Sequence, residues 1–254
     1  MNLQFSTATL IALLLGTVRA SAWIVLCPPF NSSIIPAQAK ALMGFMLALP
    51  LTPMLAKQAP SADFAPLITS AAEQVVVGAS LAFVTYLFFA AIQAAGDLID
   101  LFGGFALAFG FDPLSSTQTS VFGRFYNLIA VTLLFASNGH MIVLRGFMQS
   151  YQTLPLTGAF SIGNLSRVAT TGLGQMFMSA LQIAGPLIAV LFLTDVALGL
   201  LNRVAPALNA FSLGFPAKIF ITLSTAATAI AVLPNALGSL INVATKAVVG
   251  LSGG

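Results

Sequence analysis

Apolar residues follow one another along this chain in long runs that contain few charges. Shorter segments with proline, glycine and polar residues separate six such runs, which cover residues 3–26, 41–55, 67–95, 125–144, 168–194 and 219–245. About 20 apolar residues in a helix cross the hydrocarbon core of a bilayer. The pattern therefore predicts an all-α, membrane-associated fold of long helices arranged as hairpins, with a partial span at 41–55.

Proline and glycine mark where these helices end or kink. Pro28 and Pro29 should end the first run, because proline has no backbone N–H and restrains the residue before it. Pro50 and Pro53 should shorten the second run, and Asn138-Gly139-His140 interrupts the fourth. We therefore expect kinked helices rather than straight ones.

Two polar connections divide the chain unequally. Residues 150–166 form a long link, and residues 195–218 form a second one with Gly199 and Pro206. The part before the first link holds several helices with a broken centre. The part after it is predicted to be one long helical hairpin.

Composition supports a membrane location. Hydrophobic residues make up 58% of the 254 residues and charged residues only 6%, against about 25% charged in soluble domains. The net charge is +3. Basic residues are scattered singly along the chain and form no basic run, so no nucleic-acid partner is expected. Lipid or partner subunits should cover much of this surface.

Residues with the chemistry of enzymes and metal sites are scarce. The single cysteine, Cys27, and the single histidine, His140, predict no internal disulfide, no metal site and no cofactor. No phosphate-binding loop or nucleophile motif is present. We therefore expect no enzyme activity.

Asp97 and Asp100 lie three positions apart and would share one face of a helix. Gly96 precedes them and Gly103 and Gly104 follow, which would allow another backbone to approach closely. An acid at the centre of a bilayer costs about 2.5–3.5 kcal/mol. Two interpretations stay open: a proton- or cation-responsive site, and ion pairs or helix capping at a subunit contact.

The segment 103–113 combines glycine with bulky aromatic residues. Its candidate gating residues are Gly103, Gly104, Phe105, Phe109, Phe111, Asp112 and Pro113. Glycine permits a bent backbone and phenylalanine supplies an apolar obstruction. The segment is predicted to be a re-entrant loop, either as a constriction or plug in a pore or as a packed core loop.

Asp195 and Arg203 lie eight positions apart with Gly199 between them. On an unbroken helix they would fall near one face, although glycine and the following Pro206 could break it. We expect a structural or interfacial pair of charges, with a transport site as the alternative.

Several pieces of the chain together resemble one known family. They are residues 198–206 and 211–216, Arg19 with Pro28 and Pro36, Gly96-Asp97 with Asp100 and Gly103, Asp112-Pro113, Asn138-Gly139-His140 and Thr153-Leu154-Pro155. In this order they are similar to the FliR family of flagellar biosynthetic proteins, the R component of the type III export gate. Gly214-Phe215-Pro216 favours the flagellar branch over the related injectisome T component.

This resemblance implies a function that composition cannot supply. Members of the family join the P and Q components, and the B component, in a gate in the bacterial inner membrane at the flagellar basal body. Residues 1–165 would resemble the P component and residues 166–254 the Q component. Unfolded flagellar proteins would pass through the pore, and the loop from Gly103 to about Ser120 would project into it and help to close it.

Two other functions are weighed against the export gate. A stand-alone small-solute transporter or ion channel could also place broken helices and charges at mid-membrane, but such proteins often carry internal repeats, which are not found here. A membrane-bound enzyme is disfavoured, because no nucleophile–base arrangement is visible.

Overall fold

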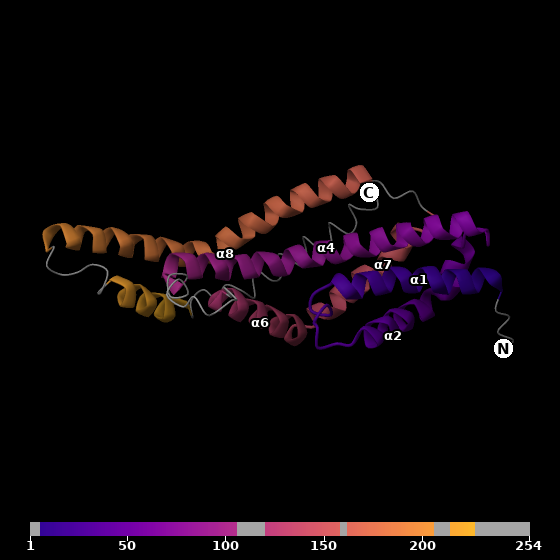
Figure 1. Ribbon diagram of the computed structural model, residues 1–254, viewed down its shortest axis with the longest axis horizontal. Coiled ribbons are helices and arrows are strands. Elements are labelled where there is room, and N and C mark those ends of the chain that lie inside the picture. The colour runs from indigo at the N-terminus through magenta and orange to yellow at the C-terminus, as the bar shows by residue number, and fades with distance from the viewer. Residues whose placement is uncertain (1–5, 106–119, 158–161, 206–213, 227–254) are drawn as a thin grey trace. The chain divides into compact units, whose positions relative to one another are not determined.

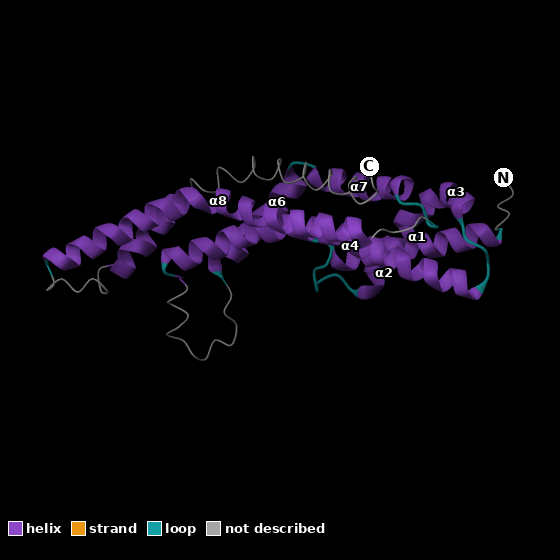
Figure 2. Ribbon diagram, turned by 90° about the horizontal axis from the view of Figure 1, so that it is seen from above, coloured by secondary structure: helices purple, strands orange, loops and turns teal. Residues whose placement is uncertain are grey.

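A computed structural model describes residues 6–105, 120–157, 162–205 and 214–226 of the chain. Over these ranges the regular structure is helical, and turns and loops join the helices (Figure 2). The all-α prediction is therefore confirmed for the described part of the chain.

The helices follow one another as labelled in Figure 1. They are α1 (Thr7–Leu26), α2 (Ala37–Ala48), η1 (Leu49–Leu51), α3 (Thr52–Leu55), η2 (Ala56–Gln58), α4 (Phe64–Gly103), α6 (Val121–Ala136), α7 (Gly139–Thr153) and α8 (Ile162–Val204). Residues 214–226 form one more helical segment.

Four described stretches are long and apolar enough to cross a membrane. They are Thr7–Leu26, Ala37–Gln58, Phe64–Gly103 and Gly163–Val204. Helices α6 and α7 make a fifth candidate, a broken span bent by 78°. The bend lies at Asn138, whose φ is 57°, so the predicted interruption at Asn138-Gly139-His140 is confirmed.

Two helices run further than the sequence predicts. Helix α4 continues through the two aspartates to Gly103, beyond the apolar run that ends at residue 95. Helix α8 continues through Asp195 and Gly199 to Val204. One glycine inside a helix costs only about 1 kcal/mol, so Gly199 does not end α8. The helix ends two residues before Pro206, because a proline disfavours helical backbone at the residue before it.

The second apolar run is also longer than predicted. Pro36 is the N-cap residue of α2, and Pro50 and Pro53 fall in the first turns of η1 and α3. A proline in a first turn removes an N–H that would have had no helical partner. The helical path therefore continues to Gln58 instead of ending as a partial span.

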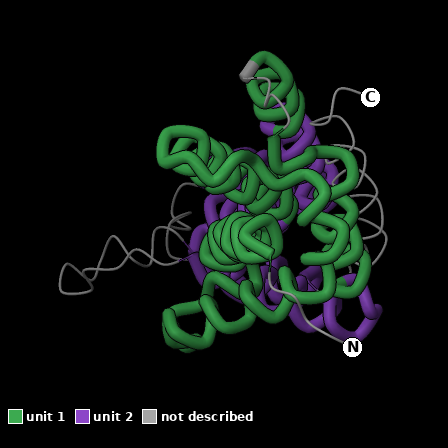
Figure 3. Tube along the Cα trace, turned by 90° about the vertical axis from the view of Figure 1, so that its right-hand side faces the viewer, with its two compact units in different colours: residues 1–88, 140–172, 241–254 green, residues 89–139, 173–240 purple. Residues whose placement is uncertain are grey.

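The chain forms two compact units (Figure 3). Residues 1–88, 140–172 and 241–254 belong to the first unit, and residues 89–139 and 173–240 to the second. Helices α4 and α8 contribute to both. Because the units interleave along the chain, they do not test the predicted division at residue 165, which stays a prediction.

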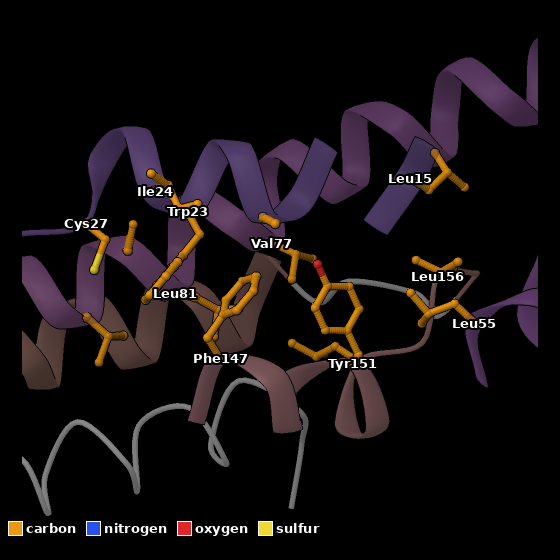
Figure 4. Packing of buried hydrophobic residues seen from close by; sticks show 14 of the residues in the cluster. Leu15, Trp23, Ile24, Cys27, Leu55, Val77, Leu81, Phe147, Tyr151 and Leu156 are labelled. Atoms are coloured by element: carbon orange, nitrogen blue, oxygen red, sulfur yellow. The ribbon is translucent and has the colours of Figure 1, made fainter. Parts of the chain in front are cut away.

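The core of the first unit is built on one face of α1. Its buried positions recur at helical spacing and are Ala12, Leu15, Gly16, Arg19, Ala20, Trp23 and Ile24. Trp23 stacks on Phe147 of α7 with ring centroids 4.4 Å apart, and Val77 and Leu81 of α4 belong to the same cluster (Figure 4). Three helices distant in sequence thus share one core.

A buried arginine fastens this core. Arg19 is 0% exposed and donates from Nε to Gln74 Oε1 at 2.6 Å, from Nη1 to the Ser150 carbonyl at 3.2 Å and from Nη2 to the Leu154 carbonyl at 2.8 Å. Its guanidinium lies 4.3 Å from the ring centroid of Tyr151. This network explains why α7 continues past Ser150, where a polar connection was predicted.

Candidate functional site

The predicted gating residues fall partly within the described structure. Gly103, Gly104 and Phe105 are described, whereas Phe109, Phe111, Asp112 and Pro113 lie outside the described residues. The structure therefore addresses the two ends of the predicted loop, which are the last turns of α4 and the start of α6. Both ends belong to the second compact unit.

Asp97 and Asp100 both lie on α4, as predicted, but in different surroundings. Asp100 is 3% exposed, whereas Asp97 is exposed. The start of α6 lies against both residues, since a Cβ atom at Gly123 would meet the Asp97 carboxylate as well, but it buries only Asp100. The two carboxylates therefore differ in solvent exposure although they lie near each other on one helix.

The carboxylate of Asp100 fastens the start of α6. Its Oδ2 accepts a short hydrogen bond from the Ser120 hydroxyl and a second one, of 2.9 Å, from the Phe122 backbone N–H. Ser120 is the N-cap residue of α6, and its Oγ accepts from the Gly123 N–H at 2.8 Å. A negative charge at a helix N-terminus is stabilised by the exposed N–H groups and the helix dipole.

The other carboxylate oxygen of Asp100 is placed differently. Oδ1 is buried and has no hydrogen-bond partner among the described residues. The geometry therefore contains a helix-capping arrangement and also an oxygen that could take a proton. Both interpretations of the two aspartates, a proton- or cation-responsive site and helix capping at a contact, therefore stay open.

Gly96 sets the close approach of α4 and α6. A Cβ atom built at this position would lie 2.5 Å from the Phe122 carbonyl oxygen and 2.6 Å from Gly123 N and Cα. These are backbone atoms, which cannot rotate away. The two helices can therefore cross at this distance only because residue 96 has no side chain.

The end of α4 also packs against residues 214–226. A Cβ at Gly103 would meet Thr222 Oγ1 at 2.8 Å, and Gly104 has φ +84° and lies beside the Phe215 ring. Phe105 packs edge-to-face on Phe122, with centroids 5.3 Å apart. The positive φ turns the chain out of the helix, as predicted for a glycine that permits a bent backbone.

Sequence reasoning missed the partners of Asp100. Ser120 stands directly before the run that begins at Val121, which is the signature of an N-cap residue. The predicted helix begins at residue 125, four residues after the observed start of α6, and therefore does not include this N-cap.

The second predicted pair of charges is arranged differently from expectation. Asp195 Oδ1 pairs with Lys218 Nζ at 2.6 Å, rather than with Arg203. Asp195 and Arg203 are both exposed in the isolated chain. An interfacial role for either residue stays a prediction.

The described residues contain no group of three histidine, cysteine or acidic side chains that could hold a metal ion. Cys27 is buried, and burial raises the pKa of its thiol to about 12. At the junction of α4 and α6, the hydrogen bonds of Asp100 and Ser120 hold two backbone segments together.

Comparison with known proteins gives a consistent result over nearly the whole chain. The family model described as "Bacterial export proteins, family 1" matches residues 10–244. The "Flagellar biosynthetic protein FliR" of Pectobacterium carotovorum subsp. carotovorum is 31% identical over 217 residues, which cover 85% of this chain and 83% of that protein. The protein of the same name from Bacillus subtilis (strain 168) is 32% identical over 215 residues, 83% of each chain.

An injectisome protein is also similar over a shorter stretch. The "Surface presentation of antigens protein SpaR" of Shigella flexneri is 33% identical over 148 residues, which are 58% of this chain and 56% of that protein. Similarity to the flagellar proteins therefore extends further along the chain.

Proposed function

Because the chain belongs to the bacterial export proteins of family 1, we propose that it is a structural and gating subunit of the flagellar type III protein-export channel. Its family and its apolar helices make it a flagellar export component of the inner membrane. The finer proposal adds that it assembles with the P and Q components, and with the B component, around a pore for unfolded flagellar proteins. Residues 1–165 take the place of a P component and residues 166–254 that of a Q component.

The uncovered surface of α8 supports assembly with other subunits. The apolar 18-residue stretch of α8 has a mean hydropathy of 2.1, and 22% of it is buried. The corresponding stretch of α4 has a mean hydropathy of 2.3, and 67% of it is buried. The two helices are thus equally apolar but unequally covered by their own chain. Exposed side chains such as Phe177, Phe192 and Leu200 need lipid or neighbouring subunits around them.

The observation that carries the gating role is the hydrogen bonding of Asp100 to Ser120 and Phe122. These hydrogen bonds join the end of α4 to the start of α6, so the described residues on either side of the segment 106–119 are held close together. A loop with fixed ends is suited to projecting toward a pore, and Phe105, Phe109 and Phe111 give it bulk. Gly104 turns the chain at the end of α4, whereas Asp112 and Pro113, which lie outside the described residues, are proposed from the sequence alone.

Native mass measurement tests the assembly. The chain is co-expressed with the neighbouring products of its operon and extracted in mild detergent. We expect a complex with several P and Q subunits and one copy of this chain. A protein that stays alone and moves a small solute in liposomes would instead support the stand-alone transporter or ion channel.

A deletion tests the gate. Removing residues 115–119 should leave the complex assembled but let ions leak across the membrane, because the shortened loop cannot close the pore. Replacing the same five residues by glycine and serine is the matched control, since it keeps the length. An assembled deletion variant with unchanged conductance would refute the gating role.

A further inference from the structure

The first compact unit contains an apolar cavity at one end of its helices. The cavity has a volume of about 250 Å³ and is lined by Trp23, Ile24, Phe30, Met43, Met46 and Leu144, together with Leu47. The last turn of α1, the connection 27–36, the second half of α2 and α7 each contribute to it. We propose that this cavity binds one acyl chain of an anionic phospholipid, with the phosphate held at Lys40.

The place of the cavity along the helices fits a lipid. Helix α1 ends at Leu26 and α2 begins at Ala37, and both belong to stretches able to cross a membrane. If both helices span the membrane, the connection between them lies at one membrane face. Trp23 is three residues from the end of α1, and Met43 is six residues from the start of α2. At 1.5 Å per residue these two positions lie within about 10 Å of the connection, and Met46 and Leu47 extend the cavity to about 15 Å along α2.

Size selects the part of the lipid that enters. Pockets for drug-sized ligands hold about 300–1,000 Å³, so a cavity of about 250 Å³ takes part of one acyl chain rather than a whole lipid. The lining is apolar throughout, so nothing inside it would hold a headgroup. The headgroup must therefore lie outside, at the membrane face.

Charge at this end favours an anionic headgroup. Helices α1, α2 and α7 and the connection 27–36 contain no aspartate or glutamate, but they carry Arg19, Lys40, Arg145 and His140. The first acidic residue of the chain is Asp63. Arg19 already donates its hydrogen bonds inside the core. Arg145 is exposed on α7.

Lys40 is the group best placed to hold the phosphate. It lies one turn before Met43 and two turns before Leu47 on the same face of α2. Its Nζ donates to the Asn31 carbonyl at 3.1 Å, which keeps the ammonium beside the connection. An ammonium has three donors, so two remain for phosphate oxygens. Lysine stems can lie along apolar surface while the charge reaches the membrane face.

The single tryptophan of the chain makes the proposal testable. Trp23 lines the cavity and is 1% exposed, so lipid around the protein cannot touch it directly. The full chain is reconstituted in nanodiscs that contain, at equal mole fraction, acyl-brominated phosphatidylglycerol or acyl-brominated phosphatidylcholine. We expect stronger quenching of Trp23 by the anionic lipid. The preference should be roughly fivefold, which corresponds to about 1 kcal/mol for one lysine near a membrane surface.

Three variants separate the parts of the proposal. Lys40→Gln should bring the preference close to one, whereas Lys57→Gln, in η2, should leave it unchanged. Leu47→Phe fills the cavity and should weaken quenching by both lipids. Far-UV circular dichroism confirms folding of each variant.

Three results would overturn the proposal. They are equal quenching by the two lipids in the wild type, an unchanged preference in Lys40→Gln, and undiminished quenching in Leu47→Phe. The test does not depend on the export role, because it uses the chain without other subunits.

Discussion

Arg19 donates a 2.6 Å hydrogen bond from Nε to Oε1 of Gln74, and both side chains are buried in the first compact unit. Gln74 in turn donates from Nε2 to the Leu156 carbonyl at 3.1 Å. A positive charge on α1 is thus held by an amide and by backbone carbonyls rather than by a carboxylate. The arrangement fixes α1, α4 and the end of α7 together.

Replacing Arg19 should destabilise the protein strongly. Arg19→Met leaves the Gln74 amide oxygen and the Leu154 carbonyl without the guanidinium donor, while the Ser150 carbonyl keeps the Leu154 N–H; each buried unsatisfied group costs about 1–3 kcal/mol. We expect a loss of about 3 kcal/mol, measured as a lower midpoint of thermal unfolding in detergent. Arg19→Lys should recover little, because an ammonium lacks the planar fork that reaches three acceptors.

Arg145→Met is the matched control for this substitution. Arg145 is exposed on α7, so the same chemical change should move the midpoint hardly at all. Equal effects at positions 19 and 145 would show that the buried network does not stabilise the fold.

Removing the Asp100 carboxylate should loosen the start of α6. Asp100→Ala leaves the Phe122 N–H without its acceptor, and Ser120→Ala removes the N-cap, which typically costs about 1 kcal/mol. Because the two side chains bond to each other, the double variant should lose less than the sum of the single losses. Hydrogen exchange at the Phe122 and Gly123 amides reports the change directly.

Ser137→Ala provides the comparison at the other end of α6. Ser137 follows the last residue of that helix, so its loss should leave exchange at Phe122 as in the wild type. Additive effects of the Asp100 and Ser120 substitutions would contradict their coupling.

A side chain at Gly96 should force α4 and α6 apart. In Gly96→Ala the new Cβ would lie 2.5 Å from the Phe122 carbonyl oxygen, and such overpacking costs typically 1–3 kcal/mol. Gly185→Ala in α8 meets nothing within 4 Å and should be neutral or stabilising by up to about 1 kcal/mol. Thermal unfolding of the two variants side by side decides whether the crossing is as tight as described.

The Cys27 thiol should resist alkylation in the folded protein. Burial raises its pKa from 9.0 to about 12, so at pH 8 roughly one molecule in ten thousand carries the reactive thiolate. Maleimide should label Cys27 slowly in mild detergent and rapidly in denaturing detergent at the same pH. Rapid labelling of the native protein would show that the thiol is accessible.

The same pKa shift has a consequence for stability in alkali. Between pH 9 and pH 12 the folded state keeps the thiol proton that the unfolded state has released. The free energy of unfolding should therefore fall as the pH rises through this window. Cys27→Ser should remove that part of the pH dependence.

Local sequence patterns predicted the helices well, and long-range contacts explain what they missed. Pro28 and Asn138 ended or bent helices as expected, because proline and a left-handed residue act on their own backbone. The apolar run stops at residue 95 and did not show where α4 ends, because the buried Asp100 near that end is hydrogen-bonded to residues at the start of α6 that lie 20 and 22 positions away. The pairing of Asp195 with Lys218 was hidden for the same reason, because it joins residues 23 positions apart.

The partners of Arg19 also set an order of events during synthesis. The Ser150 carbonyl lies 131 residues and the Leu154 carbonyl 135 residues after Arg19 in the chain. At about 5–20 residues per second, a ribosome needs roughly 7 to 26 seconds to produce a stretch of this length. Gln74 follows Arg19 by only 55 residues, so during that interval the guanidinium has one of its three acceptors, and the network is complete only once α7 has been made.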